Sequence, residues 1–232
     1  MIYIIKHIDI EGPGTLGDFL LEQKEPFCVA ELGSGEPLRQ DLGGIKAVVV
    51  LGGPMNVYEE DKYPFLKAEQ VFIQSVLKRK VPYLGICLGS QLLAKASGGK
   101  VTAAPNKEIG WYNNIRLTAE GKKDPLLKGF NEGGQVFHWH GDMFHVPSQG
   151  QLLATSAGCP SQAFRVGSNA YGIQFHVELK ENDIAAWCRA YGATDLPKAS
   201  DRRRGMIERY RCYKDEFNDQ AFCLYENFLK LC

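Results

Sequence analysis

The sequence lacks the features that would mark a membrane protein, a secreted protein or a nucleic-acid-binding protein. No uninterrupted apolar run reaches the length of a membrane span, and the apolar start at residues 1–7 is shorter than a signal-peptide core and follows no basic region. The 27 basic and 27 acidic side chains balance, so charge provides no attraction to nucleic acid or to an anionic membrane. We therefore expect neither a nucleic-acid partner nor a membrane partner.

The cysteines show no pattern that would predict a disulfide framework or a zinc site. The seven are odd in number, scattered and without C-x-x-C spacing, which is typical of a protein of the reducing cytoplasm, and we expect that location. Packing is the expected role of the six that lie outside any motif: Cys28, Cys159, Cys188, Cys212, Cys223 and Cys232. The sequence also has no internal repeat and no nucleotide-binding G-x-x-x-x-G-K-[ST] motif.

Apolar strands that alternate with helical stretches predict an α/β fold. Over the first half of the chain this alternation indicates a doubly wound, mostly parallel sheet with helices on both faces. We expect strands at 1–6, 27–30, 47–51 and 81–84, and helices near 15–22 and 64–78. After Gly98 the strands shorten, which predicts an antiparallel extension and a mixed sheet. Those strands are expected near 100–102, 112–117, 136–139, 152–156, 163–165 and 170–175.

The last fifty or so residues are predicted to be a helical extension. The length of 232 residues suits one sizeable domain, 1–232, in which 180–232 packs on the rest. Helical patterns cover 183–191 and 215–229, and a stretch with Pro and Gly at 192–205 separates them. We expect these helices to cover the sheet; a docking surface for another subunit is the alternative.

Residues 81–91 read V-P-Y-L-G-I-C-L-G-S-Q and nominate Cys87 as a nucleophile. A short apolar strand precedes this cysteine and a helix-forming stretch, 88–95, follows it, so Cys87 falls at a strand-to-helix junction. Gly85 and Gly89 allow a tight turn there, as in the G-x-S-x-G nucleophile elbow. The unpaired N–H groups of a helix start favour the thiolate, which is the reactive form. A small buried cysteine with a packing role is the alternative interpretation.

A second candidate set lies at residues 171–178, Y-G-I-Q-F-H-V-E. We interpret this segment as a strand that ends in His176 and Glu178. Because side chains alternate along a strand, the two point the same way, and the carboxylate can accept a hydrogen bond from the imidazole. A base oriented by a third group is what activates a thiol for attack. Solvated side chains at a strand end are the alternative for this pair taken alone.

These two motifs resemble those of the class I glutamine amidotransferases, G-x-C-x-G-x-Q and F-H-x-E. The likeness runs from the first strand to about Leu179 and is closest to stand-alone relatives of the amidotransferase domain of GMP synthetase. It implies a flavodoxin-like three-layer sandwich in which Cys87 attacks the carboxamide of glutamine. It further implies that His176 serves as general base and then protonates the leaving ammonia, and that Glu178 orients His176. The products would be glutamate and ammonia, with no cofactor.

The resemblance also implies residues that stabilise and hold the substrate. The turn after strand 47–51 would supply one oxyanion donor, the N–H of Gly53, and the elbow would supply the other, the N–H of Leu88. Gln91 lies one helical turn after the cysteine, on the same helix face. The remaining expected substrate-binding residues are Met55, Trp139 and Gly141, the last two acting through main-chain groups.

The segment 136–142, V-F-H-W-H-G-D, departs from the GMP synthetase pattern, which has small residues at positions 138 and 139. We expect the indole of Trp139 to narrow or reshape the pocket. The histidines at 138, 140 and 145 also suggest a metal site, but no cysteine or acidic ligand follows at finger-like spacing, so we expect no metal. The E-x-G stretch at Glu108 resembles a structural support of the site in the family. The loop 56–63 follows the oxyanion turn and is a candidate lid.

The leading functional hypothesis is a glutamine-type amidohydrolase that works through a γ-glutamyl thioester, alone or with a separate synthetase subunit that receives the ammonia. Its small-molecule partner would be glutamine or another γ-glutamyl compound. One alternative is a γ-glutamyl peptidase with the same triad, and another is a non-catalytic binding or regulatory protein with the same fold. A related group of peptidases and chaperones has histidine directly after the elbow cysteine, and Leu88 at that position argues against it.

Overall fold

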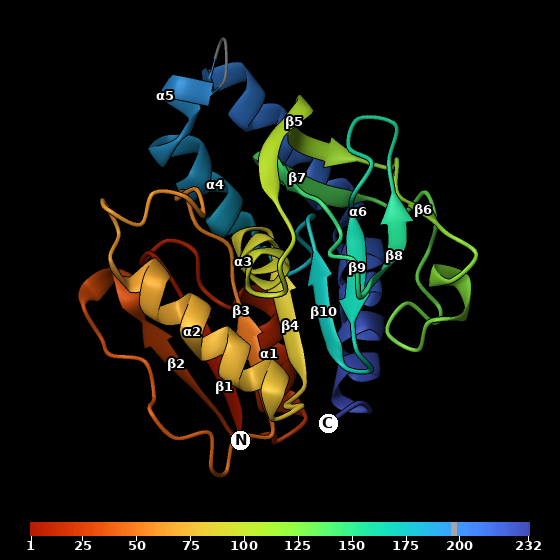
Figure 1. The fold of residues 1–232 in the computed structure, drawn as a ribbon. Helices are drawn as coiled ribbons and strands as arrows, with labels where there is room; N and C mark the ends of the chain where they lie inside the picture. The colour runs from red at the N-terminus through yellow and green to blue at the C-terminus, as the bar shows by residue number, and fades with distance from the viewer. Residues whose placement is uncertain (196–198) are drawn as a thin grey trace.

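The structure is a computed structural model that describes residues 1–195 and 199–232, and its centre is an eight-stranded mixed sheet (Figure 1). The order of the strands is β2-β1-β3-β4-β10-β9-β8-β6. Their bounds are β1 (Ile2–Lys6), β2 (Phe27–Glu31), β3 (Ala47–Val50), β4 (Tyr83–Ile86), β6 (Arg116–Leu117), β8 (Gly150–Thr155), β9 (Ala163–Val166) and β10 (Ala170–Ile173). The strands from β2 to β10 in this order are parallel, and those from β10 to β6 are antiparallel. The predicted mostly parallel, mixed sheet is therefore confirmed.

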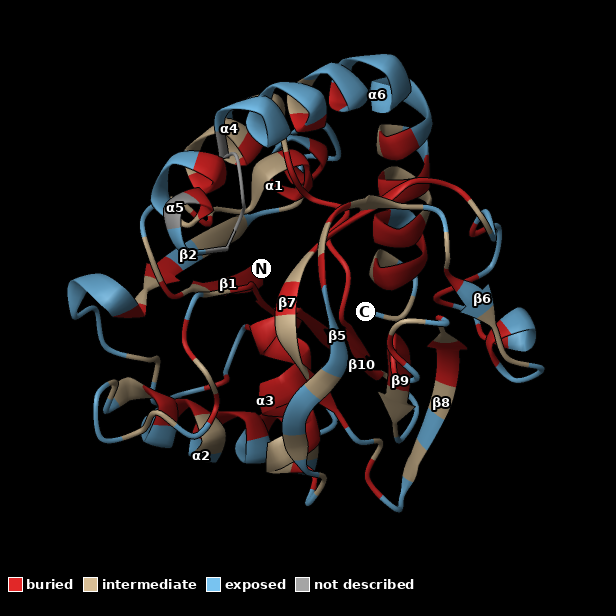
Figure 2. Cartoon of the chain, turned by 90° about the horizontal axis from the view of Figure 1, so that it is seen from above, coloured by how far each residue is buried: buried red, intermediate tan, exposed pale blue. Residues whose placement is uncertain are grey.

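Helices cover both faces of the sheet, as the alternation of strands and helices predicts. The helices of the described residues are α1 (Gly14–Glu22), α2 (Phe65–Lys78), α3 (Leu88–Ala96), α4 (Glu181–Ala190), α5 (Gly192–Asp195) and α6 (Ala199–Leu229), with short 3₁₀ turns η1 (Leu32–Ser34) and η2 (Gly121–Lys123). Helices α1 and α6 lie on one face of the sheet and α2 and α3 on the other. Central strands are apolar on both faces because both are covered. In β3, Val49 packs with α1 and α6, whereas Val48 and Val50 pack with α2 and α3. The sheet thus lies between two helical layers, which Figure 2 shows from above.

A separate antiparallel pair, β5 (Val101–Tyr112) and β7 (Val136–Phe144), crosses above the carboxyl ends of the parallel strands (Figure 1). The prediction of separate strands at 100–102 and 112–117 was wrong, because β5 continues between them. Pro105 and its neighbours interrupt the apolar pattern, but the ladder with β7 tolerates them as an irregularity between Ala103 and Glu108. Strand β7 is likewise longer than predicted, and it forms one wall of the site.

The C-terminal segment folds back over the sheet. Helix α6 has 31 residues, so the prediction of a helix at 215–229 found only its second half. The first half is mostly polar and exposed, and of its described side chains only Met206 and Tyr210, one helical turn apart, are buried. The stretch 192–205, which was predicted to separate two helices, contains α5 and the start of α6. Residues 196–198 of this stretch lie outside the described residues. The buried half of α6 packs on α1, where Tyr225 contacts Phe19 at a ring separation of 5.5 Å. None of the helices in the described part of the chain is both long and apolar enough to cross a membrane.

Candidate active site

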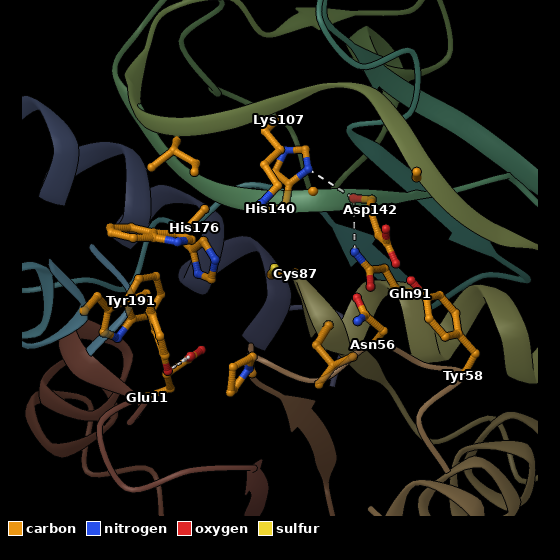
Figure 3. Close-up of a pocket in the computed structure, with 18 residues that line it drawn as sticks. Glu11, Asn56, Tyr58, Cys87, Gln91, Lys107, His140, Asp142, His176 and Tyr191 are labelled. Carbon is orange, nitrogen blue, oxygen red and sulfur yellow. Dashed lines mark hydrogen bonds between the residues drawn. The ribbon is translucent and has the colours of Figure 1, made fainter. Parts of the chain in front are cut away.

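A cavity of about 460 Å³ lies where four parallel strands end, below the β5–β7 pair. The segments that follow β1, β3, β4 and β10 meet there because parallel neighbours place their carboxyl ends at one edge of the sheet. Cys87 and His176 both line this cavity, although they lie 89 positions apart in the sequence (Figure 3). The two motifs that the sequence analysis paired are therefore neighbours in space.

Cys87 occupies a strained turn between β4 and α3. Its φ of 50° and ψ of −107° lie in a region that residues with a side chain rarely adopt. The turn is possible only with glycine on both sides: a Cβ at Gly85 would overlap the carbonyl of Gly89, and a Cβ at Gly89 would overlap the carbonyl of Val50. The N–H of Cys87 is anchored to the carbonyl of Ile173 at 2.8 Å. The elbow geometry predicted from the G-x-C-x-G spacing is present.

His176 lies beside Cys87 and is held by Glu178. Nδ1 of the imidazole donates to Oε1 of the carboxylate at 2.6 Å, and the other carboxylate oxygen accepts the N–H of Val177 at 3.0 Å. This bond leaves Nε2 available to the thiol. The two side chains lie together, because a Cβ at Gly52 would lie 3.0 Å from Cε1 of His176 and 3.7 Å from Cβ of Cys87. Burial opposes the charged imidazole, but the negative charges of Glu178 and Cys87 outweigh it and raise the pKa of His176 well above 6.5. The arrangement favours the imidazolium form of His176.

The predicted reason for this contact was wrong, although the contact itself is present. Strand β10 ends at Ile173, so His176 and Glu178 are not neighbours on one face of a strand. His176 instead pairs with Phe137 of β7 in an isolated bridge, with N–H to carbonyl distances of 2.7 and 3.2 Å in the two directions. The β7 strand therefore sets the position of the histidine, which sequence periodicity does not reveal.

Gln174 is a buried residue of the site that the sequence analysis missed. Its Nε2 lies 3.6 Å from Sγ of Cys87 and donates toward it, and its Oε1 accepts from Nε2 of Gln91 at 3.3 Å. A donor aimed at sulfur stabilises the thiolate more than the thiol. Position 174 lies just past the end of β10 at Ile173, so strand periodicity does not identify it.

The turn after β3 lies directly against the elbow. Gly53 and Leu88 both line the cavity, and a Cβ at Gly53 would lie 2.8 Å from Cδ2 of Leu88. Leu88 is the first residue of α3, so its N–H has no partner within the helix. A buried pair fixes the turn from behind: Nδ1 of His7 donates to the carbonyl of Gly52 at 2.8 Å, and Nε2 of His7 lies 3.0 Å from Glu69.

The predicted substrate-binding residues separate into three that line the cavity and one that does not. Gln91, Trp139 and Gly141 line it, and Nε2 of Gln91 donates to the carbonyl of Asp142 at 3.3 Å. Met55 is absent from the lining among the described residues; its side chain is buried in the core, and a Cβ at Gly53 would lie 3.2 Å from its sulfur. Met55 therefore packs behind the turn, between Pro54 and Asn56, which both line the cavity.

The histidines of β7 form a buried cluster with Glu108 of β5. Nδ1 of His138 lies 3.1 Å from Nε2 of His140, which in turn lies 3.2 Å from Oε2 of Glu108. Burial disfavours the charge on Glu108, but the hydrogen bond from His140 and the nearby His138 outweigh it and lower the pKa of Glu108 to about 2. Burial and the charge of His140 lower the pKa of His138 to about 3.

Glu108, His138 and His140 have the residue types and the spacing of metal ligands, with their ligand atoms within 4.8 Å of one another. The carboxylate is nevertheless already an acceptor for Asn114 at 2.9 Å and Gln162 at 2.7 Å, besides His140. We interpret the cluster as a hydrogen-bonded support of β7, the role expected for the E-x-G stretch. His145, the third histidine considered, lies apart and contacts Thr102 at 2.9 Å.

The cavity has further polar and aromatic walls that no motif indicated. Asn56 and Tyr58 of the expected lid loop line it on the side of Gln91 and Asp142, whereas Glu11 and Tyr191 lie on the side of His176 (Figure 3). Glu11 follows β1 and Tyr191 follows α4, so 180 positions separate them. Only the fold reveals such a pair, because neither residue has a sequence pattern of its own.

Comparison with known proteins agrees with this geometry. The sequence model of the family described as glutamine amidotransferase class-I matches residues 34–185. A glutamine amidotransferase-like protein of Salmonella typhimurium, YfeJ, is 34% identical over 181 residues, which are 77% of this chain and 75% of that protein. A GMP synthase (glutamine-hydrolyzing) of Porphyromonas gingivalis is 32% identical over 148 residues, but these cover only 27% of its length.

Solved structures extend the likeness to nearly the whole chain. A glutamine amidotransferase from Thermotoga maritima has a TM-score of 0.89 at 35% identity and covers 99% of this chain and 97% of its own. A second, from Methylobacillus flagellatus, has a TM-score of 0.85 at 27% identity, with 99% and 94% covered. Both alignments include the C-terminal helices, which lie beyond the segment that the family model matches.

Proposed function

This chain belongs to the class I glutamine amidotransferase family, and from that premise we propose that it hydrolyses a γ-glutamyl amide through a thioester on Cys87. The observation that carries the proposal is the contact of Cys87 with His176, which Glu178 holds at 2.6 Å in the wall of the cavity. The family includes glutamine-hydrolysing enzymes by the names of its members, and glutamine is accordingly the first substrate to test.

The first half of the reaction forms the thioester. The thiolate of Cys87 attacks the γ-carbonyl carbon, and the carbonyl electron pair moves to oxygen, where the N–H groups of Gly53 and Leu88 stabilise it. When the carbon–oxygen double bond re-forms, the carbon–nitrogen bond breaks, and the imidazolium of His176 gives its proton to the departing nitrogen. The raised pKa of His176 suits this step, because it keeps the proton on the imidazole at neutral pH.

The second half of the reaction returns the enzyme to its starting state. His176, now neutral, takes a proton from a water molecule that attacks the thioester carbon. The carbon–sulfur bond breaks, glutamate leaves, and the thiolate of Cys87 is restored beside the imidazolium. Glu178 holds the ring through its hydrogen bond to Nδ1, in the orientation that directs Nε2 to the reacting atoms. Gln91 and the main-chain groups of Trp139 and Gly141 are proposed to hold the γ-glutamyl group.

The direct test is hydrolysis of glutamine by the wild type and by Cys87→Ala. We expect the variant to lose all measurable activity, and we expect mass spectrometry of the wild type during turnover to show a γ-glutamyl adduct on the Cys87 peptide. Cys212→Ala is the matched control, because Cys212 is exposed on α6 and should be dispensable. Full activity of Cys87→Ala would contradict the mechanism. A wild type that neither hydrolyses γ-glutamyl amides nor reacts with a glutamine-directed electrophile would instead support a binding protein.

An ammonia-accepting synthetase subunit is the second candidate for the biological context. The observation in its favour is that the GMP synthases match this chain over only about a quarter of their length. Such a partner predicts a glutaminase rate that rises when the partner and its substrates are added. If the purified protein hydrolyses glutamine at a rate that no added synthetase and none of its substrates increase, the result would instead support a hydrolase that works alone.

A further inference from the structure

The cavity extends to both sides of Cys87, and the two sides have different chemistry (Figure 3). Gln91 and Asp142 lie on one side, and Glu11 and Tyr191 lie on the side of His176. In the proposed reaction His176 protonates the departing nitrogen, so the leaving amine occupies the His176 side and the γ-glutamyl group occupies the other. The residues around Glu11 therefore face the leaving group, an assignment that rests on the proposed function.

Glu11 is a buried carboxylate that the proposed mechanism does not use. Its side chain lies in the wall of the cavity, and the residue is 6% exposed. A Cβ at Gly52 would lie 2.8 Å from Oε2 of Glu11, 3.0 Å from Cε1 of His176 and 3.7 Å from Cβ of Cys87. Glycine at position 52 thus allows the carboxylate to approach the reacting groups.

Tyr191 holds the Glu11 side chain in place. Its hydroxyl donates to Oε1 of Glu11 at 2.7 Å. The charged groups that act on it are His176 and His7, which favour its ionised form, and Glu178, which opposes it. Burial is the largest influence and raises the pKa of Glu11. A cation brought by a ligand would stabilise this carboxylate.

Aromatic rings complete the same side of the cavity. Tyr191 lies 5.9 Å from the ring of Trp139 and 6.5 Å from that of Trp187, centroid to centroid, and Trp187 lies 4.8 Å from His176. Trp139 is the bulky residue that the sequence analysis expected to reshape the pocket, and its indole indeed stands on the leaving-group side. Aromatic faces attract cations, most strongly where water is excluded. A buried carboxylate surrounded by three aromatic rings is an arrangement that binds organic cations.

We propose that Glu11, Tyr191, Trp139 and Trp187 form a leaving-group subsite for a positively charged amine, so that the substrate is the γ-glutamyl amide of a short aliphatic diamine. One nitrogen of the diamine forms the scissile amide, and the other, protonated, lies against Glu11. Hydrolysis breaks the amide carbon–nitrogen bond, passes the proton of His176 to the freed nitrogen and yields glutamate and the diamine. Leaving groups that carry a carboxylate, as in γ-glutamyl amino acids, are disfavoured because Glu11 repels them.

The test compares three substrates that differ in the leaving group alone: γ-glutamyl aminobutylamide, which is cationic, γ-glutamyl butylamide, which is neutral, and γ-glutamylglycine, which is anionic. For the wild type we expect kcat/KM to be at least about tenfold higher for the cationic amide than for the neutral one, because one charge-assisted hydrogen bond contributes about that factor. The anionic compound should have the lowest kcat/KM of the three. In Glu11→Gln the ratio of cationic to neutral substrate should fall to near one. Glu22→Gln, on the exposed face of α1, should keep the wild-type ratio.

A wild-type ratio near one, or a ratio that Glu11→Gln leaves unchanged, would overturn the subsite. If Glu11→Gln does not fold, Tyr191→Phe serves as the second variant, and its ratio should lie below that of the wild type because the carboxylate loses the hydroxyl that positions it. Hydrolysis of glutamine with no hydrolysis of the cationic amide would support the proposed function and overturn this inference.

Binding to Cys87→Ala separates the subsite from the reaction. Calorimetry with γ-glutamyl aminobutylamide and γ-glutamyl butylamide should show about tenfold tighter binding of the cationic compound. If the wild type hydrolyses no γ-glutamyl compound, the proposed function fails, and this binding difference decides the subsite independently. Equal affinity for the two compounds would overturn it.

Discussion

The imidazole of His7 donates a hydrogen bond from Nδ1 to the carbonyl of Gly52 at 2.8 Å and thereby fixes the turn that carries Gly53. Its other nitrogen lies 3.1 and 3.0 Å from the two carboxylate oxygens of Glu69, and both side chains are fully buried. Burial opposes the charge on His7, but Glu69 outweighs it and raises the pKa of His7 above 6.5. A buried ion pair therefore supports the proposed oxyanion turn from behind, much as Glu178 supports His176.

Removing this support should slow catalysis without weakening substrate binding. In Glu69→Gln the imidazole loses its charged partner and holds the Gly52 carbonyl less firmly, so we expect kcat to fall about tenfold, less than the loss of an oxyanion donor itself, with KM little changed. His7→Ala leaves Glu69 buried and unpaired and should cost about 3 to 5 kcal/mol of unfolding free energy. Steady-state kinetics and urea denaturation measure the two effects. A KM change with constant kcat would count against a role in the oxyanion turn.

The free energy of unfolding should fall as the pH rises through the alkaline range. The raised pKa of His176 means that its stabilising contribution is complete below its ordinary value of 6.5 and is lost as the pH passes the raised one. In Glu178→Gln the raised pKa returns toward the ordinary value, so both the stability loss and the alkaline limb of kcat/KM should move to lower pH. Glu226→Gln, exposed on α6, is the control and should leave both profiles in place. Unshifted profiles in Glu178→Gln would refute the pairing.

Gln174→Leu should make Cys87 less reactive. The variant removes the Nε2 donor that lies 3.6 Å from Sγ, and a hydrogen bond to a charged group is worth about tenfold or more in an equilibrium. We expect alkylation of Cys87 by iodoacetamide, followed by mass spectrometry, to slow about tenfold. Gln151→Leu, an exposed glutamine of β8, should react at the wild-type rate. Equal rates in both variants would show that the donor does not act on the thiolate.

Two glycine-to-alanine changes should have opposite effects on stability. In Gly89→Ala the new Cβ overlaps the carbonyl of Val50, so we expect a loss of about 3 kcal/mol or more, or no folded protein. In Gly205→Ala nothing lies within 4 Å, the position is exposed and helical, and we expect a gain of about 0.5 to 1 kcal/mol. Thermal and urea unfolding measure both. A tolerated Gly89→Ala would mean that the elbow can relax away from β3.

The local features of this protein could be predicted from its sequence because short-range periodicity and turn chemistry produce them. The apolar runs at β1 and β3, the helix after Cys87 and the glycines around it each act over a few residues, and the structure has them within one or two positions of the expected bounds. The β4 strand was placed two residues too early because the apolar run starts at Val81, whereas the ladder with β10 begins at Tyr83. Family motifs then linked Cys87 with His176 across the chain.

Contacts between distant segments could not be predicted in this way. Glu11 and Tyr191, or His7 and Glu69, carry no motif and meet only because β1, α2 and α4 pack around the same sheet edge. The full lengths of β5 and α6 were missed because the sequence of each contains a stretch that predicts a break. Pairing with β7 continues β5 through its stretch, and the helix of α6 continues through the other. The side chain of Met55 lies in the core and is not among the described residues that line the cavity, because proximity along the chain to Gly53 does not decide which side of a turn a side chain takes.

The sequence alone determined the α/β class, the mostly parallel sheet and the elbow at Cys87, because local propensity and residue spacing specify each of these. The resemblance to family motifs, and not a local signal, pointed to His176 and Glu178 as the partners of Cys87. Only the tertiary structure decided what surrounds the sulfur: the donor of Gln174, the ion pair behind the oxyanion turn, and the carboxylate of Glu11 among aromatic rings. These groups come from strands and helices far apart in the chain, and their meeting depends on how whole layers pack. The proposed substrate specificity therefore depends on the tertiary packing and cannot be assigned to one segment of the sequence.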